Sequence, residues 1–593
     1  MRRVHIHTPA RLHFGLFADG RGARKFGGVG MAIDRPSFDL TVRFDERDNI
    51  YSWIDPSLKP RIEALLARLR ERWDVPPVRV DVEDFIPHHV GLGSGTQLAL
   101  AVGTAITRLA RLFIRPDEMA LFLGRGKRSG IGFHASYQEG LIIDAGTSDD
   151  EHIPPILRRV QFPKDWRIVL IQPPLEPGVH GIKEIEAFQE RIIVPRETAD
   201  RLSNIALSEL APALAAADLA AFSEAVYRIN RISGECFAPV QGGVYAHSRL
   251  EEIVDDARSL GCPGIGQSSW GPTLFGFHQS AADAGAFIDR LGEAHPDLDF
   301  KIASGARENY CDGSVGTQLL VSTRSPEEAR EALAGGVDFI DVKEPDRGPL
   351  GAADIDVRNR IFDLFIPDRE SSFHGFHAQP AFAFGELSEA ERRISEEARG
   401  CREPTKLGFA VGVSAHVKIG FAGERRRSDW DRRFLNLPHP SYWHGHWGLG
   451  WFFVPTAYAD DENADAPHWR EIVERVYKKQ RHRDYFLVDT FDKRTNFWDA
   501  LGGKDGVREL FDVCEKEKID LALAGSLKAE DIDRLADEIG GLPNIIAVRG
   551  AACKDGIRTN PIDRDRVLKL RRRIIAAEVR LDRRGLGGCC GGA

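Results

Sequence analysis

The stretch Phe339-Ile340-Asp341-Val342-Lys343-Glu344-Pro345 predicts the fold of the C-terminal half of the chain. Its apolar residues favour a β-strand buried on both faces, and Pro345 cannot continue a ladder of hydrogen bonds. Lys343 should therefore stand at the carboxyl end of a strand, where parallel α/β enzymes keep their catalytic residues. A surface lysine paired with Asp341 or Glu344 is the alternative that this stretch alone leaves open.

Similar apolar β-like runs recur on both sides of this stretch. We find eight of them, at residues 319–323, 338–343, 381–386, 416–421, 451–459, 484–489, 521–524 and 544–548. Helical patterns separate most of these runs, and Ser325-Pro326-Glu327-Glu328 predicts a capping box at the start of the first helix. Strands alternating with helices in this number predict a (β/α)8 TIM barrel over residues 318–580, with an open doubly wound sheet as the alternative.

Charged residues lie at the ends of these predicted strands. Lys343 ends the second strand, Lys418 lies within the fourth, Asp489 ends the sixth and Lys493 follows it. Strand ends converge on one mouth of a barrel, so we predict that these four residues and Asp341 form a catalytic site. Loops after the last two strands of such barrels commonly bind phosphate. The predicted phosphate-binding residues there are Gly525, Ser526, Arg549 and Gly550.

In these blocks the chain resembles the (5-formylfuran-3-yl)methyl phosphate synthase family over about residues 318–575. The resemblance rests on segments that include Asp341-Val342-Lys343-Glu344-Pro345, Val417-Lys418-Ile419-Gly420, Asp489-Thr490 with Lys493, and Ala524-Gly525-Ser526-Leu527. It implies that two molecules of glyceraldehyde 3-phosphate condense to a furan without a cofactor. Lys343 would form a Schiff base and Lys493 would transfer protons. A general class I aldolase is the competing interpretation.

The N-terminal region, residues 1–306, contains several glycine-rich turns. Its β-like and helical runs begin with a strand near residues 4–8 and a loop at residues 11–15. The segment 87–97 places glycines before a helical pattern, so its backbone N–H groups can cradle a phosphate, and Ser94 or Thr96 can cap the helix. A tight structural turn is the alternative. The predicted anion-binding residues are Gly91, Gly93, Ser94, Gly95, Thr96, Arg125, Lys127, Arg128, Gln267 and Ser268.

The order of these turns resembles the β-ribofuranosylaminobenzene 5′-phosphate synthase family, a branch of the GHMP kinase superfamily. The matching segments include residues 8–15, 27–30, 34–36 and 91–97, together with the blocks around Arg125 and Gln267. The resemblance implies an α+β GHMP-kinase-like fold. It also implies condensation of phosphoribosyl pyrophosphate with 4-hydroxy- or 4-aminobenzoate, with loss of pyrophosphate and carbon dioxide. Mg²⁺ suits pyrophosphate chemistry, although no carboxylate cage for it is visible. An ATP-dependent kinase is the competing interpretation.

The length and composition of the chain limit its possible domain number, partners and location. A chain of 593 residues exceeds one ordinary domain, and we expect a linker at residues 307–317 and a flexible glycine- and cysteine-rich tail at residues 581–593. The net charge of −9 gives no basic footprint for nucleic acid. We find neither a signal peptide nor an apolar run long enough to span a membrane, which predicts a cytoplasmic protein with reduced cysteines. The sequence predicts no metal site.

The two regions together predict a bifunctional enzyme of one-carbon cofactor biosynthesis. Its two halves would serve methanopterin-type and methanofuran-type carriers, act on small phosphorylated metabolites and form a homo-oligomer. The alternative is that one half has lost catalysis and serves as a binding or assembly module. The histidine- and tryptophan-rich segment at residues 425–450 is predicted to be a solvated or lid loop, and Cys589 and Cys590 stay without a role.

Overall fold

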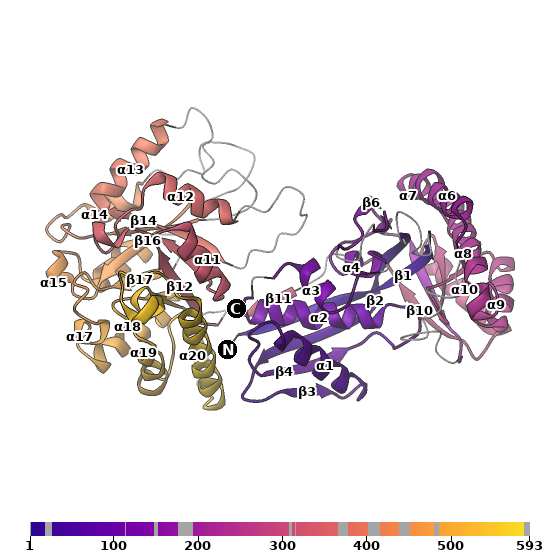
Figure 1. Cartoon of the computed structure of the whole chain (residues 1–593), viewed down its shortest axis with the longest axis horizontal. Helices are drawn as coiled ribbons and strands as arrows, with labels where there is room; N and C mark the ends of the chain where they lie inside the picture. The colour runs from indigo at the N-terminus through magenta and orange to yellow at the C-terminus, as the bar shows by residue number, and fades with distance from the viewer. Residues whose placement is uncertain are drawn as a thin grey trace.

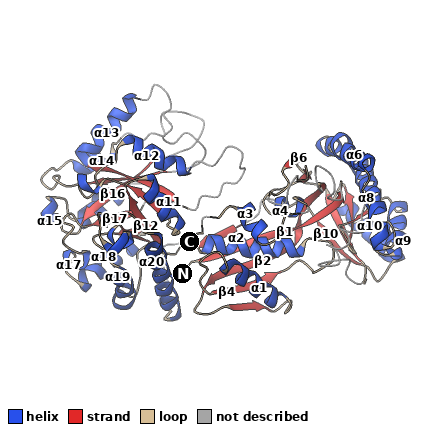
Figure 2. Cartoon of the chain, viewed as in Figure 1, coloured by secondary structure: helices blue, strands red, loops and turns tan. Residues whose placement is uncertain are grey.

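The computed structural model describes residues 2–17, 27–112, 114–127, 129–147, 152–175, 194–306, 311–314, 316–365, 378–400, 415–437, 451–478 and 485–585. These residues form two lobes that lie side by side along the long axis of the molecule (Figure 1). Long strands run through the first lobe, whereas helices surround the strands of the second (Figure 2). The GHMP-kinase-like region and the barrel predicted from the sequence are these two lobes.

The first lobe contains two β-sheets. The larger sheet has the order β11-β1-β2-β4-β3, with β5 pairing with β2 and β6 with β5. Its strands are β1 (Arg3–Leu16), β2 (Gly28–Phe44), β3 (Asn49–Ser52), β4 (Val78–Asp84), β5 (Leu141–Asp144), β6 (Ile156–Val160) and β11 (Cys311–Ser314). The smaller sheet has the order β10-β7-β9-β8, formed by β7 (Arg167–Gln172), β8 (Gly266–Gln267), β9 (Leu274–His278) and β10 (Asp299–Ala303).

Strand β1 corrects one expectation. The predicted loop at residues 11–15 is wrong, because β1 continues past Pro9 to Leu16, with a register shift between Pro9 and Ala10. Leu12 and Phe14 are buried in the core and favour continued strand pairing with β2. The alternation of a strand then turns Arg11 and His13 away from Leu12, toward a pocket described below.

Helices pack on both sheets of the first lobe (Figure 1). They are α1 (Leu58–Arg70), α2 (Ser94–Leu109), α3 (Pro116–Phe122), α4 (Ile131–Ala135), α6 (Arg196–Asn204), α7 (Ala211–Ala215), α8 (Leu219–Gln241), α9 (Ser248–Ser259) and α10 (Ala281–Ala294), with a π-helical turn at Ile205–Leu210. Helix α2 follows the glycine segment, as predicted. Its predicted caps Ser94 and Thr96 are wrong: the N-cap is Gly93, whose φ of 82° lies in the left-handed region that favours glycine.

The second lobe is a closed barrel of parallel strands, as the sequence predicts. The strands are β12 (Gln318–Thr323), β13 (Phe339–Val342), β14 (Gln379–Glu386), β15 (Ala415–Gly420), β16 (Trp451–Tyr458), β17 (Phe486–Asp489), β18 (Leu521–Leu523) and β19 (Ile545–Val548). β19 pairs with β12 and closes the barrel. All of β13 is buried, so Lys343 follows a strand that is covered on both faces.

Helices alternate with the barrel strands. They are α11 (Pro326–Ala334), α12 (Ile355–Phe362), α13 (Leu387–Gly400), α14 (Trp430–Leu435), α15 (Asp461–Ala464), α16 (Trp469–Ile472), α17 (Phe497–Ala500), α18 (Lys504–Lys516), α19 (Ala529–Arg534) and α20 (Arg564–Arg583). Short 3-10 or π-helical turns cover residues 345–347, 363–365, 473–477, 535–539, 550–552 and 554–556. The predicted cap of α11 is confirmed, since the Ser325 side chain accepts from the Glu328 backbone N–H.

The junction between the lobes departs from a plain linker. Residues 311–314, inside the predicted linker, form β11 and pair antiparallel with the start of β1. Helix α20, which extends beyond residue 580, packs on both lobes. Its residues Ile574 and Ala577 belong to the core of the barrel, whereas Ile575 and Val579 belong to the core of the first lobe. α20 is therefore shared by the two lobes.

Buried charges reinforce this junction. The guanidinium groups of Arg2 and Arg111 both face the Asp338 carboxylate, which precedes β13. On α20, Glu578 accepts a hydrogen bond from the Thr317 backbone N–H at 2.5 Å. At the rim, Arg43 of β2 pairs with Asp582 of α20 at 3.0 Å. Ion pairs and a hydrogen bond thus connect residues near both ends of the chain at this junction.

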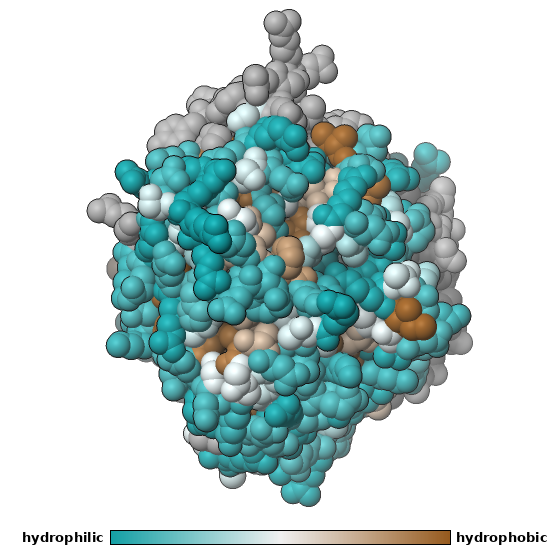
Figure 3. All heavy atoms as spheres, turned by 90° about the vertical axis from the view of Figure 1, so that its left-hand side faces the viewer, coloured by the Kyte–Doolittle hydropathy of each residue, from teal (hydrophilic) through white to brown (hydrophobic). Residues whose placement is uncertain are grey.

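The structure also bears on the predictions about membrane spans, cysteines and the remaining segments. No helix in the described segments is long and apolar enough to cross a membrane. Cys236, Cys262, Cys514 and Cys553, whose side chains are described, form no disulfide. The face of the barrel lobe in Figure 3 is mostly hydrophilic, with small separated hydrophobic spots. Arg128, Cys589, Cys590 and the part of the histidine- and tryptophan-rich segment at residues 438–450 lie outside the described residues.

Candidate active sites

The carboxyl ends of the barrel strands bring the five predicted catalytic residues together. Lys418 Nζ lies 2.5 Å from Asp341 Oδ2, and Lys493 Nζ lies 2.6 Å from Asp489 Oδ1. Lys343 Nζ is 3.8 Å from Asp341 Oδ2 and donates to the Pro349 carbonyl at 3.4 Å. Each carboxylate thus has a close lysine partner of its own, and Lys343 is held more loosely between the two pairs.

Burial and charge set the protonation of this cluster. Burial, assisted by the cations of Lys418 and Lys493, lowers the pKa of the Lys343 amine to about 7 against the attraction of Asp341. Burial also lowers the pKa of Lys493, despite Asp489 beside it. Burial alone would raise the pKa of Asp341, but Lys418 and Lys343 outweigh it and hold this carboxyl ionised. Lys343 therefore has a substantial neutral fraction at neutral pH.

A cavity of about 450 Å³ opens above these residues. Three of the predicted phosphate-binding residues line it with backbone or hydroxyl groups: Gly525, Ser526 and Gly550. At Gly525 φ is 103°, and a Cβ there would lie 2.9 Å from Thr490 Cγ2, so the turn requires glycine. Ser526 Oγ donates to the Lys493 carbonyl at 2.8 Å, which anchors the turn to the loop that carries Lys493.

Arg549 also lines this cavity, but protein acceptors engage its guanidinium group. It donates to the Glu328 carboxylate at 2.9 Å, to the Ser322 carbonyl at 2.9 Å and to the Arg558 carbonyl at 3.0 Å. Its side chain is 2% exposed. In this arrangement Arg549 supports the backbone of the pocket wall and positions the segment that carries Arg558.

Sequence reasoning missed three cations that line the barrel cavity, namely Lys528, Arg558 and Arg566. Arg558 is close enough to Asp489 and Asp341 for each carboxylate to influence the pKa of its guanidinium group, which burial lowers. Arg558 lies eight residues beyond Gly550, the last of the predicted phosphate-binding residues. A search continued through the next charged turn could have found it.

The first lobe holds a second cavity, of about 420 Å³, where the glycine segment meets β1 and α8. Gly91, Gly93, Ser94, Gly95 and Thr96 line it at the N-terminus of α2, as predicted. Gly91 has a φ of 86°, and a Cβ at this position would collide with the Ser268 carbonyl oxygen. The segment therefore approaches its neighbours as only glycine allows, and it lies at the N-terminus of α2, where the positive end of the helix dipole favours an anion.

Four cations line this cavity: Arg11, Arg61, Arg125 and Lys127. Arg125 and Lys127 were predicted, whereas Arg11 and Arg61 were missed as site residues. Arg11 donates to the Gly91 carbonyl, so it also supports the glycine segment. Among the described residues that line the cavity there is no Asp or Glu. The cavity has the electrostatic character of an anion-binding site.

The two predicted residues of the 266–273 turn differ in position. Gln267 lines the cavity, where its side chain accepts from the Ala246 N–H and donates to the Ser269 carbonyl. Ser268 is fully buried behind the wall. Its hydroxyl donates to the Gly91 carbonyl at 2.7 Å and accepts from the His13 N–H at 3.1 Å. Ser268 thus clamps the glycine segment to β1.

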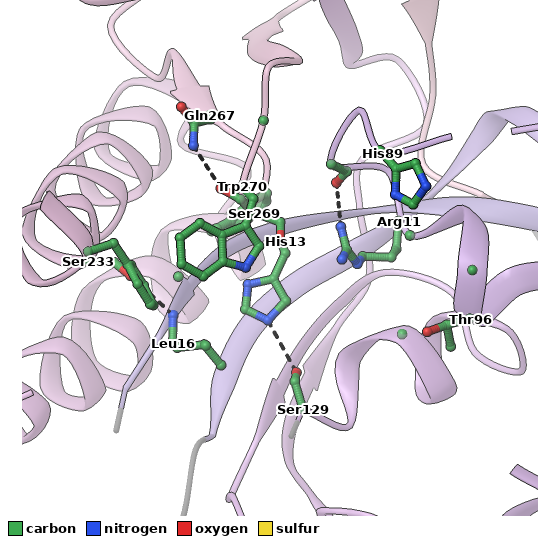
Figure 4. Close-up of a pocket in the computed structure, with 18 of the residues that line it drawn as sticks. Arg11, His13, Leu16, His89, Thr96, Ser129, Ser233, Gln267, Ser269 and Trp270 are labelled. Atoms are coloured by element: carbon green, nitrogen blue, oxygen red, sulfur yellow. Dashed lines mark hydrogen bonds between the residues drawn. The ribbon is translucent and has the colours of Figure 1, made fainter. Parts of the chain in front are cut away.

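A chain of polar side chains crosses the wall of the same cavity. His13 Nε2 lies 3.2 Å from Ser129 Oγ (Figure 4). Ser129 Oγ in turn donates to Asp144 Oδ2 at 3.2 Å. Apolar side chains lie on the other side of His13, among them Leu16, Phe237 and Trp270. From the sequence we predicted a loop at residues 11–15 in this part of the chain. The alternation of a strand would have placed Arg11 and His13 together on one face.

No group of three or more His, Cys, Asp or Glu side chains within the described ranges is arranged to hold a metal ion.

Comparisons with known proteins match the two lobes separately. A family model described as 4-HFC-P synthase matches residues 319–571. Models described as GHMP kinases N terminal domain and GHMP kinases C terminal match residues 61–140 and 210–297. The chain thus combines sequence features of two families without overlap.

Curated relatives give the same division. The beta-ribofuranosylphenol 5′-phosphate synthase of Methanothermobacter thermautotrophicus is 32% identical over 292 residues, which cover 46% of this chain and 87% of the relative. The enzyme of the same name from Archaeoglobus fulgidus is 32% identical and is covered to 89%, over 47% of this chain. The (5-formylfuran-3-yl)methyl phosphate synthase of Methanocaldococcus jannaschii is 30% identical over 43% of this chain and 97% of the relative.

Identity at this level over nearly the whole of each relative decides the membership of both halves. The chain belongs to two enzyme families joined in one polypeptide: its first half is a member of the beta-ribofuranosylphenol 5′-phosphate synthase family and its second half a member of the (5-formylfuran-3-yl)methyl phosphate synthase family.

Proposed function

We propose that the first half transfers the phosphoribosyl group of phosphoribosyl pyrophosphate to 4-hydroxybenzoate, with loss of pyrophosphate and carbon dioxide, in methanopterin-type cofactor synthesis. The observation that carries this proposal is the glycine segment at the N-terminus of α2, facing a cavity lined by four cations. The name of the relatives specifies a ribosylphenol product. It favours the 4-hydroxy acceptor over the 4-amino acceptor, both of which the sequence left open.

The parts of the cavity suit the parts of this reaction. The backbone N–H groups of residues 91–95 and the side chains of Arg125 and Lys127 would receive the departing pyrophosphate, because donors aimed at developing charge lower the barrier. The apolar side chains Phe237 and Trp270 would hold the benzoate ring. We further propose that Mg²⁺ enters bound to pyrophosphate oxygens, as a companion of the substrate.

The experiment for the first half is an assay of the full chain with labelled phosphoribosyl pyrophosphate and 4-hydroxybenzoate in the absence of ATP. We expect release of pyrophosphate and carbon dioxide in equal amounts. A requirement for ATP, or phosphorylation of an alcohol at its expense, would instead identify a small-molecule kinase. Addition and chelation of Mg²⁺ in the same assay tests the role proposed for the ion.

We propose that the second half joins two molecules of glyceraldehyde 3-phosphate to (5-formylfuran-3-yl)methyl phosphate, in methanofuran-type cofactor synthesis. The observation that carries this proposal is the buried Lys343 amine, with a pKa near 7, beside two lysine–carboxylate pairs. A neutral amine can attack a triose carbonyl and form an imine with loss of water. The named product of the relatives is the furan.

The neighbouring residues supply the proton transfers that this chemistry needs. Once the imine has formed, loss of an α proton to Asp489 or Lys493 gives an enamine, whose carbon attacks the second aldehyde. Asp341 and Lys418 hold the charge balance around the imine nitrogen. Phosphate groups would bind the turns at Gly525 and Gly550, with Arg558 as a further cation.

Borohydride trapping tests the second half. The full chain is incubated with glyceraldehyde 3-phosphate, reduced, digested and analysed by peptide mass mapping, while formation of the furan is followed by its absorbance. We expect the adduct on Lys343 and a furan chromophore. An adduct on another lysine overturns the mechanism, and a simple aldol product without a furan identifies a general class I aldolase.

Activity of both halves in the same preparation would exclude the assembly-module alternative. The predicted homo-oligomer and the cytoplasmic location stay predictions; the mass of the full chain in solution, measured by light scattering, tests the first of them.

A further inference from the structure

His13 occupies the centre of the first cavity, between its polar and its apolar walls. Its side chain comes from β1 and is 7% exposed. In Figure 4 the Trp270 ring lies across the imidazole, whereas Arg11 and Thr96 mark the side of the glycine segment. His13 is thus placed between the predicted seat of the pyrophosphate and the predicted seat of the aromatic ring.

Hydrogen bonding fixes which nitrogen of His13 carries the proton. Ser129 Oγ donates its one proton to Asp144 Oδ2 and accepts from the Ile131 N–H at 3.2 Å. The hydroxyl can therefore only accept from His13 Nε2, which lies 3.2 Å away and must carry the hydrogen. Burial, assisted by the charge of Arg11, lowers the pKa of His13 to about 3, so the ring is neutral and Nδ1 presents a lone pair.

The far end of this chain is held firmly. Asp144 Oδ2 also accepts from the Gly130 N–H at 3.0 Å, and Oδ1 accepts from the Gly146 N–H at 3.0 Å. Next to the imidazole, a Cβ at Gly28 would lie 3.1 Å from His13 Cε1, so a larger residue there would push the ring out of place. Contacts from three segments of the lobe therefore fix the orientation of the His13 ring.

In the described part of the chain, His13 Nδ1 has no hydrogen-bond partner, although its ring is buried. Figure 4 shows this nitrogen on the side of Trp270 and Leu16, away from Ser129. A neutral acceptor in apolar surroundings calls for a donor on the ligand. A benzoate carboxylate cannot donate, but the hydroxyl group at the opposite end of 4-hydroxybenzoate can.

We propose that His13 Nδ1 accepts the proton of the 4-hydroxyl group of the aromatic acceptor and so activates the ring for ribosyl transfer, with Ser129 and Asp144 as positioning residues. This inference rests on the function proposed for the first half and assigns a catalytic residue to it. The charged groups nearest His13 and Ser129 are Arg11, on the same strand, and Asp144 at the end of the chain.

The proposed step balances without an added reagent. The phenolic proton passes to Nδ1 as the ring carbon that bears the carboxylate bonds to ribose C1, and the C1–oxygen bond to pyrophosphate breaks. The ring becomes a dienone whose carboxylate sits on a tetrahedral carbon. The bond to the carboxylate then breaks, its electron pair restores the aromatic ring and carbon dioxide leaves. The phenolate oxygen finally takes the proton back from Nδ1.

The decisive test compares two acceptors in the full chain. In His13→Gln, the amide can still donate to Ser129 but offers no base at the Nδ1 position. With 4-hydroxybenzoate we expect kcat to fall by roughly 10²–10⁴-fold, while KM for phosphoribosyl pyrophosphate changes little. With 3,5-difluoro-4-hydroxybenzoate, whose hydroxyl is already largely ionised, the loss should be at least about tenfold smaller, because no base is needed.

Matched variants complete the test. His7→Gln changes a histidine on the same strand that pairs with Asp39 outside the cavity, and should leave both reactions unchanged. Ser129→Ala and Asp144→Asn should lower kcat with the same dependence on the acceptor, by a smaller factor. If His13→Gln no longer binds phosphoribosyl pyrophosphate, these two variants still test the role of His13.

Equal losses with both acceptors, or a loss confined to KM for phosphoribosyl pyrophosphate, overturn the role of His13. In either case the wild-type enzyme still releases pyrophosphate and carbon dioxide. Absence of that release in the wild-type enzyme instead overturns the function proposed for the first half.

Discussion

The two cavities of this chain are of similar size but differ in how they handle charge. Lysines, arginines and carboxylates all line the barrel cavity. Asp341 and Asp489 each form a close ion pair with a lysine. The cavity of the first lobe is lined by cations without a carboxylate among its described lining residues. Carboxylates thus lie among the cations of the barrel cavity, whereas cations carry the charge among the described lining residues of the first cavity.

This difference indicates what each site is built to do. Burial, assisted by the cations of Lys418 and Lys493, lowers the pKa of the Lys343 amine, which suits covalent chemistry on a carbonyl. A cavity lined by cations at a helix N-terminus suits the binding and release of a polyanion. The first strategy depends on the protonation of a single atom and the second on total charge, so the two sites should respond differently to the same kind of change.

The largest effect should come from Lys343→Ala. Loss of the imine-forming amine should reduce furan formation by at least about 10³-fold, because no other group replaces a covalent nucleophile. Ribosyl transfer by the same molecules should be unchanged. Both activities are measured in one preparation, with Lys516→Ala on the exposed side of α18 as the control. A variant that still forms the furan would break the assignment of covalent chemistry to the barrel.

Arg125→Ala should show the opposite selectivity. Removal of one of the four cations that line the cavity should raise KM for phosphoribosyl pyrophosphate by roughly 10- to 100-fold, the usual cost of a lost charge-assisted contact. Furan formation should stay at the wild-type rate. Arg196→Ala, whose side chain is 96% exposed, serves as the control. An unchanged KM would mean that the cations of the first lobe do not bind the anion.

The pH dependence should separate the sites more finely. Lys343 must be neutral to attack, so kcat/KM for glyceraldehyde 3-phosphate should fall about tenfold per pH unit below its pKa near 7. The Lys418 cation helps to lower that pKa. Lys418→Met should therefore shift the acid limb to higher pH, by roughly one unit. If the acid limb of the pH profile stays at the same pH, Lys418 does not lower the pKa of Lys343.

The smallest and most general effect concerns the junction. Ile575→Ala removes apolar contacts of α20 with the first lobe and should cost about 2 kcal/mol of stability. Because α20 also belongs to the barrel core, both activities should be lost at a lower temperature. Heat-inactivation curves of the two activities provide the measurement. Leu157→Ala, at a site that is 52% exposed, should leave both curves in place.

The barrel was predictable from the sequence because its signals are local. Each strand is a short apolar run, and Lys343 and Asp489 sit where such runs end, so the rule that strand ends converge sufficed to group them. Glycine turns indicated segments that line the cavities in the same way. Arg549 shows the limit, since Glu328, more than two hundred residues away in sequence, decides where its guanidinium group points.

The site of the first lobe was less predictable because it depends on contacts between distant segments. His13 and Ser129 are 116 residues apart, and nothing in either segment indicates that they touch. The mistaken loop at residues 11–15 hid the alternation that turns Arg11 and His13 inward. The glycine segment itself was visible, but its cap, Gly93, replaced the expected hydroxyl residues because the chain enters α2 in a left-handed conformation.

Helix α20 also bears on how the cell can supply the two enzymes. A premature stop codon before residue 564 would remove a helix that packs on both lobes. A cut between the lobes would leave α20 on the barrel half, and separation of the halves would then expose the core residues of the first lobe that α20 covers. Translation therefore delivers the two activities in a fixed one-to-one ratio. A change in the expression of this chain alters the amounts of both halves together and leaves their ratio unchanged.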